Sequence, residues 1–146
     1  MSITAFRTAI AAALQTEFSV ELAGNTVESD RFADAQGFDG VYISVYPDSW
    51  GEALMSRGGV DANRREITLA AQFVDLYDPD PELNTPYDTA ALEAYEARLV
   101  LAVKAVRTTT PWFCRVRGTR FEQDPLGNTT RFTTRITAND DNPFWA

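Results

Sequence analysis

The side chains that could do chemistry in this sequence are carboxylates, arginines and one thiol, because the chain contains no histidine. Histidine is the commonest general base and the commonest metal ligand in proteins. The single cysteine, Cys114, would lack its usual imidazole partner as a nucleophile. Zinc would need an all-carboxylate site, although it prefers nitrogen and sulfur ligands. We therefore expect no catalytic site, no bound metal and no cofactor, and the sequence favours binding or assembly over catalysis.

One acidic run invites a calcium interpretation. It consists of Asp75, Asp78, Asp80 and Glu82. An EF-hand loop needs a central glycine and a terminal glutamate at fixed spacing, and this run has neither. A glycosidase could pair two carboxylates across a cleft, but almost any acidic chain allows that pairing. A solvated, turn-forming loop is the better interpretation of the run.

The charges are distributed unevenly along the chain. The net charge is −8, with residues 1–97 at −12 and residues 98–137 at +6. This balance argues against wrapping DNA by neutralising its phosphates. Two readings of the charge split remain open. The acidic body of one copy could attract the basic segment of another, head to tail, or the two regions could pair within one molecule.

Two groups of side chains are candidates for contacts with partners. Alternation along the C-terminal segment places four arginines on one face, namely Arg115, Arg117, Arg131 and Arg135. That face could meet nucleic acid, a negatively charged neighbour, or only water. Trp50, Phe144 and Trp145 lie in segments that look exposed, where aromatic residues are enriched at contacts. These three could instead fold back over the domain's own core.

The first half of the chain predicts one helix and three strands. Apolar spacing and a cap at Ser2 or Thr4 predict a helix over residues 3–17. A short strand is expected within 20–27, and a second one over 40–46 that Pro47 ends. We expect residues 48–63 to form a long polar loop. This loop should be mobile in the free subunit and become ordered when a partner binds. A long strand should cover 65–77 and stop at Asp78-Pro79-Asp80-Pro81.

The second half predicts a helix and a hairpin. The helix should span residues 89–107, with an apolar stripe of Leu92, Tyr95, Leu99, Val103 and Val106. The hairpin should pair residues 111–122 with 129–138, with Cys114 on its core side. The fold class is therefore α+β: a mostly antiparallel sheet packed against two amphipathic helices, with a long C-terminal β-hairpin.

Length and composition are consistent with one domain over residues 1–146, with 138–146 as an extended tail. No run approaches the roughly 20 apolar residues of a membrane span. The first residues show no signal-peptide pattern. One cysteine cannot form an internal disulfide, which fits a reducing cytosol.

This order of elements resembles the tail terminator proteins of long-tailed bacteriophages. The residues that carry the likeness are the strand from Arg65 to Asp75, the helix from Leu92 to Val106 and the hairpin from Pro111 to Thr137. The likeness covers most of the chain, but it is a pattern of elements without a ligand or catalytic signature. Small neck proteins, which join head to tail, are built from similar pieces.

The resemblance implies a structural virion protein made in the cytoplasm of a host bacterium. Such a protein forms a ring of copies, usually six, that caps the tail tube and stops its polymerisation. Its partners would be itself, the tail tube protein and a neck or head-completion protein, while the genomic DNA passes through without sequence-specific binding. From other classes, a small acidic intracellular enzyme or a regulator that mimics nucleic acid remains an alternative.

Overall fold

The first helix begins where the sequence predicts. The computed structural model describes residues 2–29, 41–57, 60–76, 89–110, 113–124 and 129–140. Helix α1 spans Ile3–Glu17, and the Ser2 hydroxyl accepts a hydrogen bond from the backbone N–H of Ala5 at 2.9 Å. This cap satisfies one of the free donors at the helix start. Phe6, Ile10 and Leu14 form the buried face of α1.

The strand expected within residues 20–27 is wrong. A short helix, α2, spans Ser19–Leu22 instead, because Phe18 and Leu22 both turn into the core at helical spacing. Ala23 then adopts a left-handed conformation, with φ of 49°, which ends the helix. Gln15 holds the following turn through a hydrogen bond from the backbone N–H of Val27 at 2.8 Å.

The expected end of the next strand at Pro47 is also wrong. Strand β1 spans Val41–Arg57 and continues through this proline. The pairing shifts by one residue between Pro47 and Ser49, which marks a β-bulge. The N–H of Val45, two residues earlier, points away from β2 and donates to the Glu28 carbonyl at 2.8 Å. The nitrogen of Pro47 lies on the same side of this edge strand, so its missing N–H costs no bond to β2.

The long loop expected at 48–63 is instead the distal half of a β-hairpin. Strand β2 spans Val60–Leu76 and pairs with β1 from Asp75, opposite Val41, to Val60, opposite Arg57. The two strands hydrogen-bond along the edges that face each other, so the polar side chains of this segment do not make it a loop. Gly58 and Gly59, between the paired ends, lie outside the described residues.

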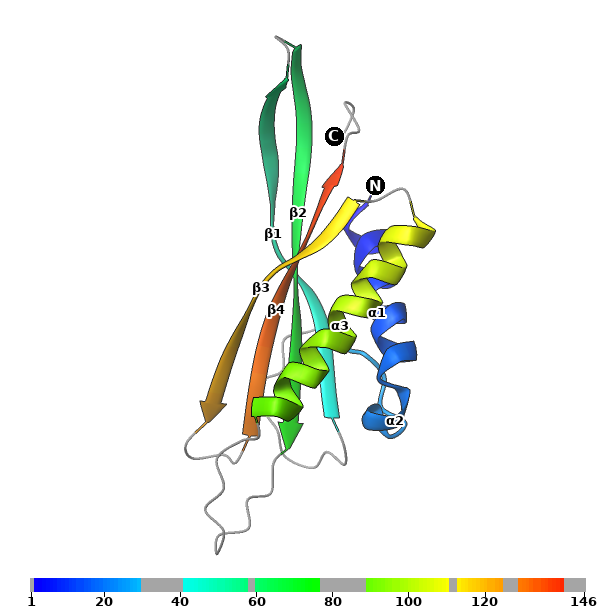
Figure 1. Ribbon diagram of the computed structural model, residues 1–146. Coiled ribbons are helices and arrows are strands. Elements are labelled where there is room, and N and C mark those ends of the chain that lie inside the picture. Colours follow the sequence, from blue (N-terminus) through cyan, green and yellow to red (C-terminus); the bar gives the residue numbers. More distant parts are fainter. Residues whose placement is uncertain are drawn as a thin grey trace, which may run out of the picture.

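Part of this hairpin projects beyond the body of the molecule (Figure 1). Pairing between β2 and strand β4 (Thr129–Asp140) begins only at Arg65. Residues 52–57 and 60–64 therefore form a two-stranded ribbon, which we call the β-arm. Within the described chain, no third strand pairs with the β-arm.

The remaining elements follow the sequence closely. Helix α3 spans Thr89–Thr109, and strand β3 spans Phe113–Asp124 and pairs with β4. The prolines after β2, Trp112 and residues 141–146 lie outside the described residues. Strand β4 runs to Asp140, two residues beyond its expected end. No described helix is long and apolar enough to span a membrane.

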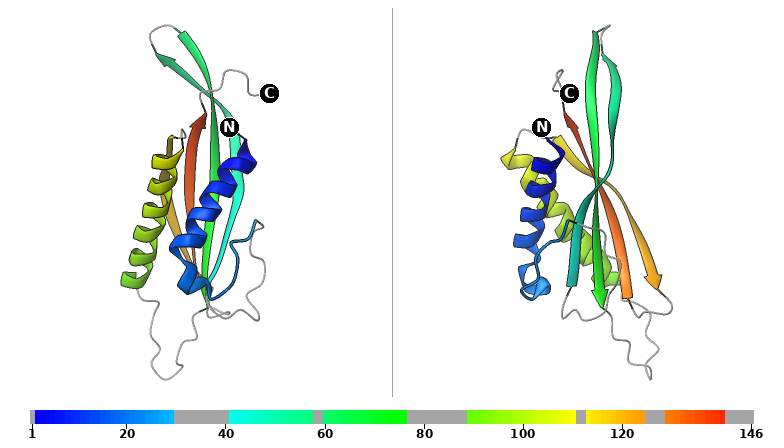
Figure 2. Two further views of the ribbon diagram at one scale, coloured as in Figure 1. Left: turned by 90° about the vertical axis from the view of Figure 1, so that its right-hand side faces the viewer. Right: turned by 180° about the vertical axis from the view of Figure 1, so that it is seen from behind.

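The four strands form one antiparallel sheet in the order β1-β2-β4-β3, and α1 and α3 cover the same face of it (Figure 2). The predicted fold class is thus confirmed as α+β. The core lies between the helices and this inner face of the sheet. Alternation places Ile67, Leu69, Ala71 and Phe73 of β2 in the core, as the sequence predicts. The opposite, outer face carries no helix in the described chain.

Aromatic rings join the layers at the centre of the core. The Phe73 ring stacks on Phe132 of β4 with centroids 4.7 Å apart and meets the edge of Phe18 at 5.2 Å. Tyr95 of α3 lies 4.9 Å from Phe73. One ring of β2 therefore contacts the neighbouring strand, the junction of α1 with α2, and α3.

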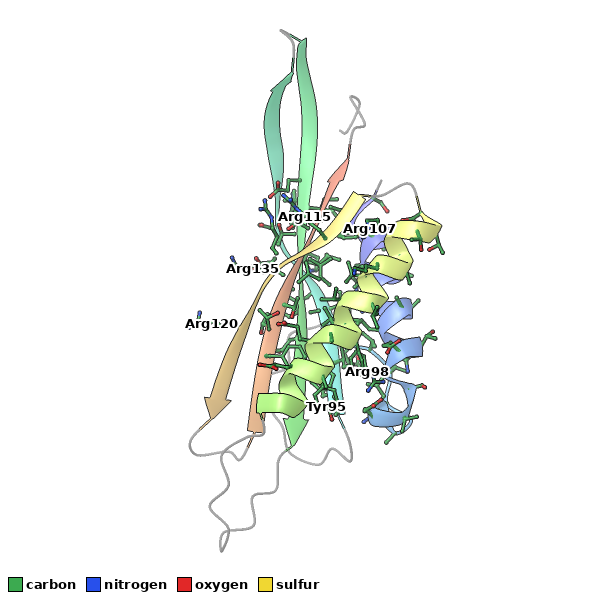
Figure 3. The ribbon with its side chains drawn as sticks, in the orientation of Figure 1. Tyr95, Arg98, Arg107, Arg115, Arg120 and Arg135 are labelled. Atoms are coloured by element: carbon green, nitrogen blue, oxygen red, sulfur yellow. The ribbon has the colours of Figure 1, made fainter. Side chains whose placement is uncertain are left out.

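Arg98 of α3 fastens this helix to the N-terminal helices (Figure 3). Its guanidinium donates to both carboxylate oxygens of Glu21 and, at 3.1 Å, to Glu17 Oε1. It also lies 4.5 Å from the centroid of the Phe18 ring. Hydrogen bonding to Arg98 lowers the pKa of Glu21 below the ordinary value of 4.5. The contact links residues 77 positions apart in the chain.

We expect Arg98→Met to lower the free energy of unfolding at pH 7 by about 1–2 kcal/mol, the range for charge-assisted hydrogen bonds that water partly reaches. Because the pKa of Glu21 is lowered in the folded state, its contribution is present above the unfolded glutamate pKa. That contribution is lost as the pH falls through the folded value. Urea denaturation of parent and variant should therefore give a difference that shrinks between about pH 5 and pH 3. Lys104→Met, at an exposed position of α3, is the control. If Arg98→Met lowered the free energy of unfolding equally at about pH 5 and about pH 3, the ion pair with Glu21 would not have this role.

Candidate interface on the outer face of the sheet

A bulge in β3 determines which arginines reach the outer face. The register of β3 against β4 shifts between Val116, opposite Ile136, and Gly118, opposite Arg135. Before the bulge, Arg115 points outward and Cys114 inward, and after it Thr119 turns inward to bond the buried Thr134 at 2.9 Å. Bulges re-aim side chains in this way. Arg117 and Arg120 consequently share the outer face, although their odd and even numbers place them on opposite faces of a regular strand.

The structure brings three of the four predicted arginines to this face. Arg115, Arg117 and Arg135 are exposed, and Arg115 and Arg135 project from the side of the sheet away from the helices (Figure 3). Arg131 lies in β4 opposite Glu122, but its side chain is outside the described part. Sequence alternation missed Arg120. The signal that could have found it is Gly118, because a glycine inside a strand often marks a bulge.

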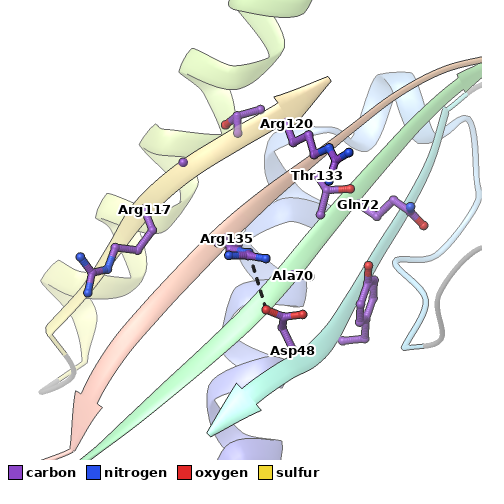
Figure 4. A pocket seen from close by; sticks show the side chains of 10 residues that line it. Asp48, Ala70, Gln72, Arg117, Arg120, Thr133 and Arg135 are labelled. Carbon is purple, nitrogen blue, oxygen red and sulfur yellow. Dashed lines mark ion pairs between the residues drawn. The ribbon is translucent and has the colours of Figure 1, made fainter. Parts of the chain in front are cut away.

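Ten residues line an open pocket of about 600 Å³ on this face (Figure 4). The central strands supply a floor that contains the nearly inaccessible Ala70 and Gln72, together with Thr133 and Arg135. Strand β1 contributes Tyr46 and Asp48, and β3 contributes the segment from Arg117 to Arg120. Small residues on the floor between longer side chains create the hollow.

The pocket is positively charged, but not uniformly. Its lining includes three arginines, at 117, 120 and 135, and one carboxylate, Asp48. Arg135 Nε lies 3.6 Å from Asp48 Oδ2, and Arg117 lies 3.9 Å from a carboxylate oxygen of Glu66. Both separations exceed ordinary hydrogen-bond length, and all four side chains are at least a third exposed. Such pairs contribute little stability and can be exchanged for other anions.

These contacts bear on the charge split in the sequence. Arginines 98, 117 and 135 of the basic segment all meet carboxylates of the acidic body within the molecule. Pairing of the basic segment with the acidic body within one molecule therefore accounts for part of the charge split. Arg115 is different, because in the described chain it has no ion pair with a carboxylate within 4.0 Å.

Of the three aromatic residues expected at contacts, the structure places one. Trp50 of β1 is 59% exposed, although its register partner Ile67 is fully buried. It lies at the base of the β-arm, where the strands leave the body. Phe144 and Trp145 lie outside the described residues. Because its side chain is largely exposed, Trp50 does not fold back over the core.

The thiol of Cys114 lies in the core against helix α3. Cys114 is fully buried, its Sγ lies 3.6 Å from the carbonyl oxygen of Val103, and burial raises the pKa of the thiol. A raised pKa keeps it in the unreactive thiol form. Across the described residues, no group of three or more cysteine and acidic side chains is arranged to hold a metal ion.

Comparison with known proteins adds no further constraint. No protein-family model matches the chain, and no curated protein matches it. The functional conclusion therefore rests on the residues and geometry described above.

Proposed function

We propose that this chain is a structural subunit of a virion that assembles with copies of itself into a ring. Following the resemblance of its elements to tail terminators, the ring would cap the tail tube of a long-tailed phage, stop its polymerisation and offer a surface to the neck. A head-tail joining protein is the nearest alternative within the same class.

The observation that carries the proposal is the β-arm. A two-stranded ribbon is marginally stable in water by itself, because it has too few neighbours to bury side chains. The β-arm has no third strand in the described chain, and it lies beyond the part of β2 that pairs with β4. Its unpaired edges are templates for pairing with another chain. A contact with a neighbouring molecule would stabilise it.

Apolar and charged groups would have different roles at such a contact. Exposed ion pairs contribute only about 0–1 kcal/mol each, so they cannot hold a ring together. Trp50 at the base of the β-arm offers a large exposed aromatic surface, the type of residue that dominates interface energetics. The arginines of the outer face would set the register and the rate of association.

The test is the solution mass of the protein across a concentration series, with negative-stain imaging of any rings. At low salt, Arg115→Glu should raise the concentration needed for assembly about tenfold, and the difference should fade as salt screens the charges. Lys104→Glu changes the net charge equally on the helical side and should assemble like the parent. A parent that stays monomeric at all concentrations, alone and with tail tube protein, would overturn the proposal.

A further inference from the structure

The edge of β1 that faces away from β2 is covered where this strand crosses the body of the molecule. The N–H of Glu28 donates to the carbonyl of Ile43 at 2.9 Å, and the N–H of Val45 donates to the carbonyl of Glu28 at 2.8 Å. Together these two bonds form an isolated parallel bridge between Glu28 and Ser44. Glu28 therefore occupies the position that a further strand of the sheet would take.

Arg7 of α1 covers the next backbone group on this edge. Its Nε donates to the carbonyl oxygen of Val45 at 2.9 Å. The N–H and the carbonyl of one residue in a strand point to the same side, so this carbonyl lies on the edge that faces away from β2. Pro47, two residues later, has no N–H. From the carbonyl of Ile43 to the nitrogen of Pro47, each backbone group on this edge is therefore bonded, or is a proline nitrogen that cannot donate.

The segment that contains Glu28 is fastened to α1 by one side chain. Gln15 Oε1 accepts from the backbone N–H of Val27 at 2.8 Å, and Gln15 Nε2 donates to the carbonyl of Asn25 at 3.1 Å. Val27 also packs against the core. We call residues 25–28 the edge strap. Its position against β1 depends on the amide group of Gln15.

The protection of this edge ends at Pro47. Unpaired N–H and carbonyl groups on an edge strand can pair with another chain, and proteins prevent this with covering segments, prolines and bulges. The body half of β1 has all three, namely the edge strap, Pro47 and the bulge before Ser49. From Ser49 to Arg57 the register with β2 is regular, and no described strand covers the other side of β1.

We infer that the edge strap and Arg7 prevent β1 of a second copy from adding to the body half of this sheet. Two uncovered β1 edges would be self-complementary, because identical strands can pair antiparallel about a two-fold axis. Pairing between copies along β1 is thereby confined to the residues beyond Pro47. The inference concerns where copies cannot pair, so it depends neither on a ring nor on a phage tail.

Hydrogen exchange and sedimentation of Gln15→Ala test the edge strap. At low protein concentration the Val45 amide should exchange at least about tenfold faster than in the parent, because the strap that accepts its hydrogen bond is released. The Ser44 amide, which faces β2 opposite Gln72, should keep its protection. At higher concentration the variant should associate, at a concentration at least about tenfold below any association of the parent, and the Val45 amide should regain protection.

Thr16→Ala is the matched control. It removes a neighbouring side-chain hydrogen bond, from Thr16 Oγ1 to the carbonyl of Ala12 within α1, without touching the edge strap. It should exchange and sediment like the parent. The Val45 amide also separates this test from ring formation, because in the parent that amide is already bonded within one molecule and its protection should not change with concentration.

Arg7→Met is a second variant that uncovers the Val45 carbonyl and leaves the edge strap in place. It should associate at a concentration about threefold below the parent without faster exchange of the Val45 amide. Association of Gln15→Ala with renewed Val45 protection supports the inference. Unchanged Val45 exchange, or faster exchange without association, overturns it. If circular dichroism shows that Gln15→Ala does not fold, Arg7→Met decides: association supports the inference, and sedimentation like the parent overturns it.

Discussion

A variant without the β-arm should fold as a stable monomer and fail to assemble. The variant deletes residues 52–65 and joins Gly51 to Glu66, which are opposite each other in the ladder, through an Asn-Gly turn. The fold should survive because every residue of the described core between the helices and the sheet is retained. Assembly should require at least about 100-fold more protein, corresponding to about 3 kcal/mol of lost association free energy. Sedimentation over a concentration series would measure the shift.

The matched control keeps both strands of the β-arm and replaces only Gly58-Gly59, the two residues between the paired ends, with Asn-Gly. This control should assemble like the parent, because it preserves both strands. If the shortened variant formed rings at the same concentration as the parent, the β-arm would have no role in assembly. If it failed to fold, melting of the control would show whether the loss of the strands or the new turn was responsible.

Phe73→Ala should be the most destabilising single substitution among those considered. Phe73 is almost fully buried and contacts the rings of Phe18, Tyr95 and Phe132, so its truncation leaves a cavity where three elements meet. Large-to-small changes of a buried phenylalanine cost about 3–5 kcal/mol, because lost burial and cavity formation add together. Denaturant unfolding of the monomer would measure this loss as a lower midpoint with an unchanged slope.

Val20→Ala is the control for that experiment. Val20 is apolar but 83% exposed on α2, so its truncation should change the free energy of unfolding by less than about 0.5 kcal/mol. A loss below about 1 kcal/mol for Phe73→Ala would show that the aromatic cluster does not anchor the two helices to the sheet.

The sequence by itself determined the elements whose periodicity is strong. The apolar stripes of α1 and α3 gave their positions within about two residues, and the alternation of β2 gave its C-terminal end but missed its first five residues. In these segments one side must face the core, so the burial of apolar side chains imposes the period of the structure on the sequence. The same argument correctly placed Cys114, Phe132 and Ile136 inside.

Tertiary structure decided the segments in which local chemistry is ambiguous. Polar residues and glycines made residues 48–63 resemble a loop, yet the described part of this segment forms a ribbon in which β1 and β2 hydrogen-bond along the edges that face each other. Residues 20–22 read as a strand, yet helical spacing buries Phe18 and Leu22 together. In both cases contacts distant in sequence outweighed local preference.

The candidate interface shows the same division. Alternation along the hairpin was enough to place Arg115, Arg117 and Arg135 on the wet face of the sheet. It could not place Arg120, because one extra residue at the bulge beside Gly118 reverses the facing of every residue after it. The pocket itself depends on side chains from all four strands, whose order in the sheet comes only from tertiary pairing. A charge pattern along a sequence can indicate that a cationic face exists, whereas the packing of strands determines its shape.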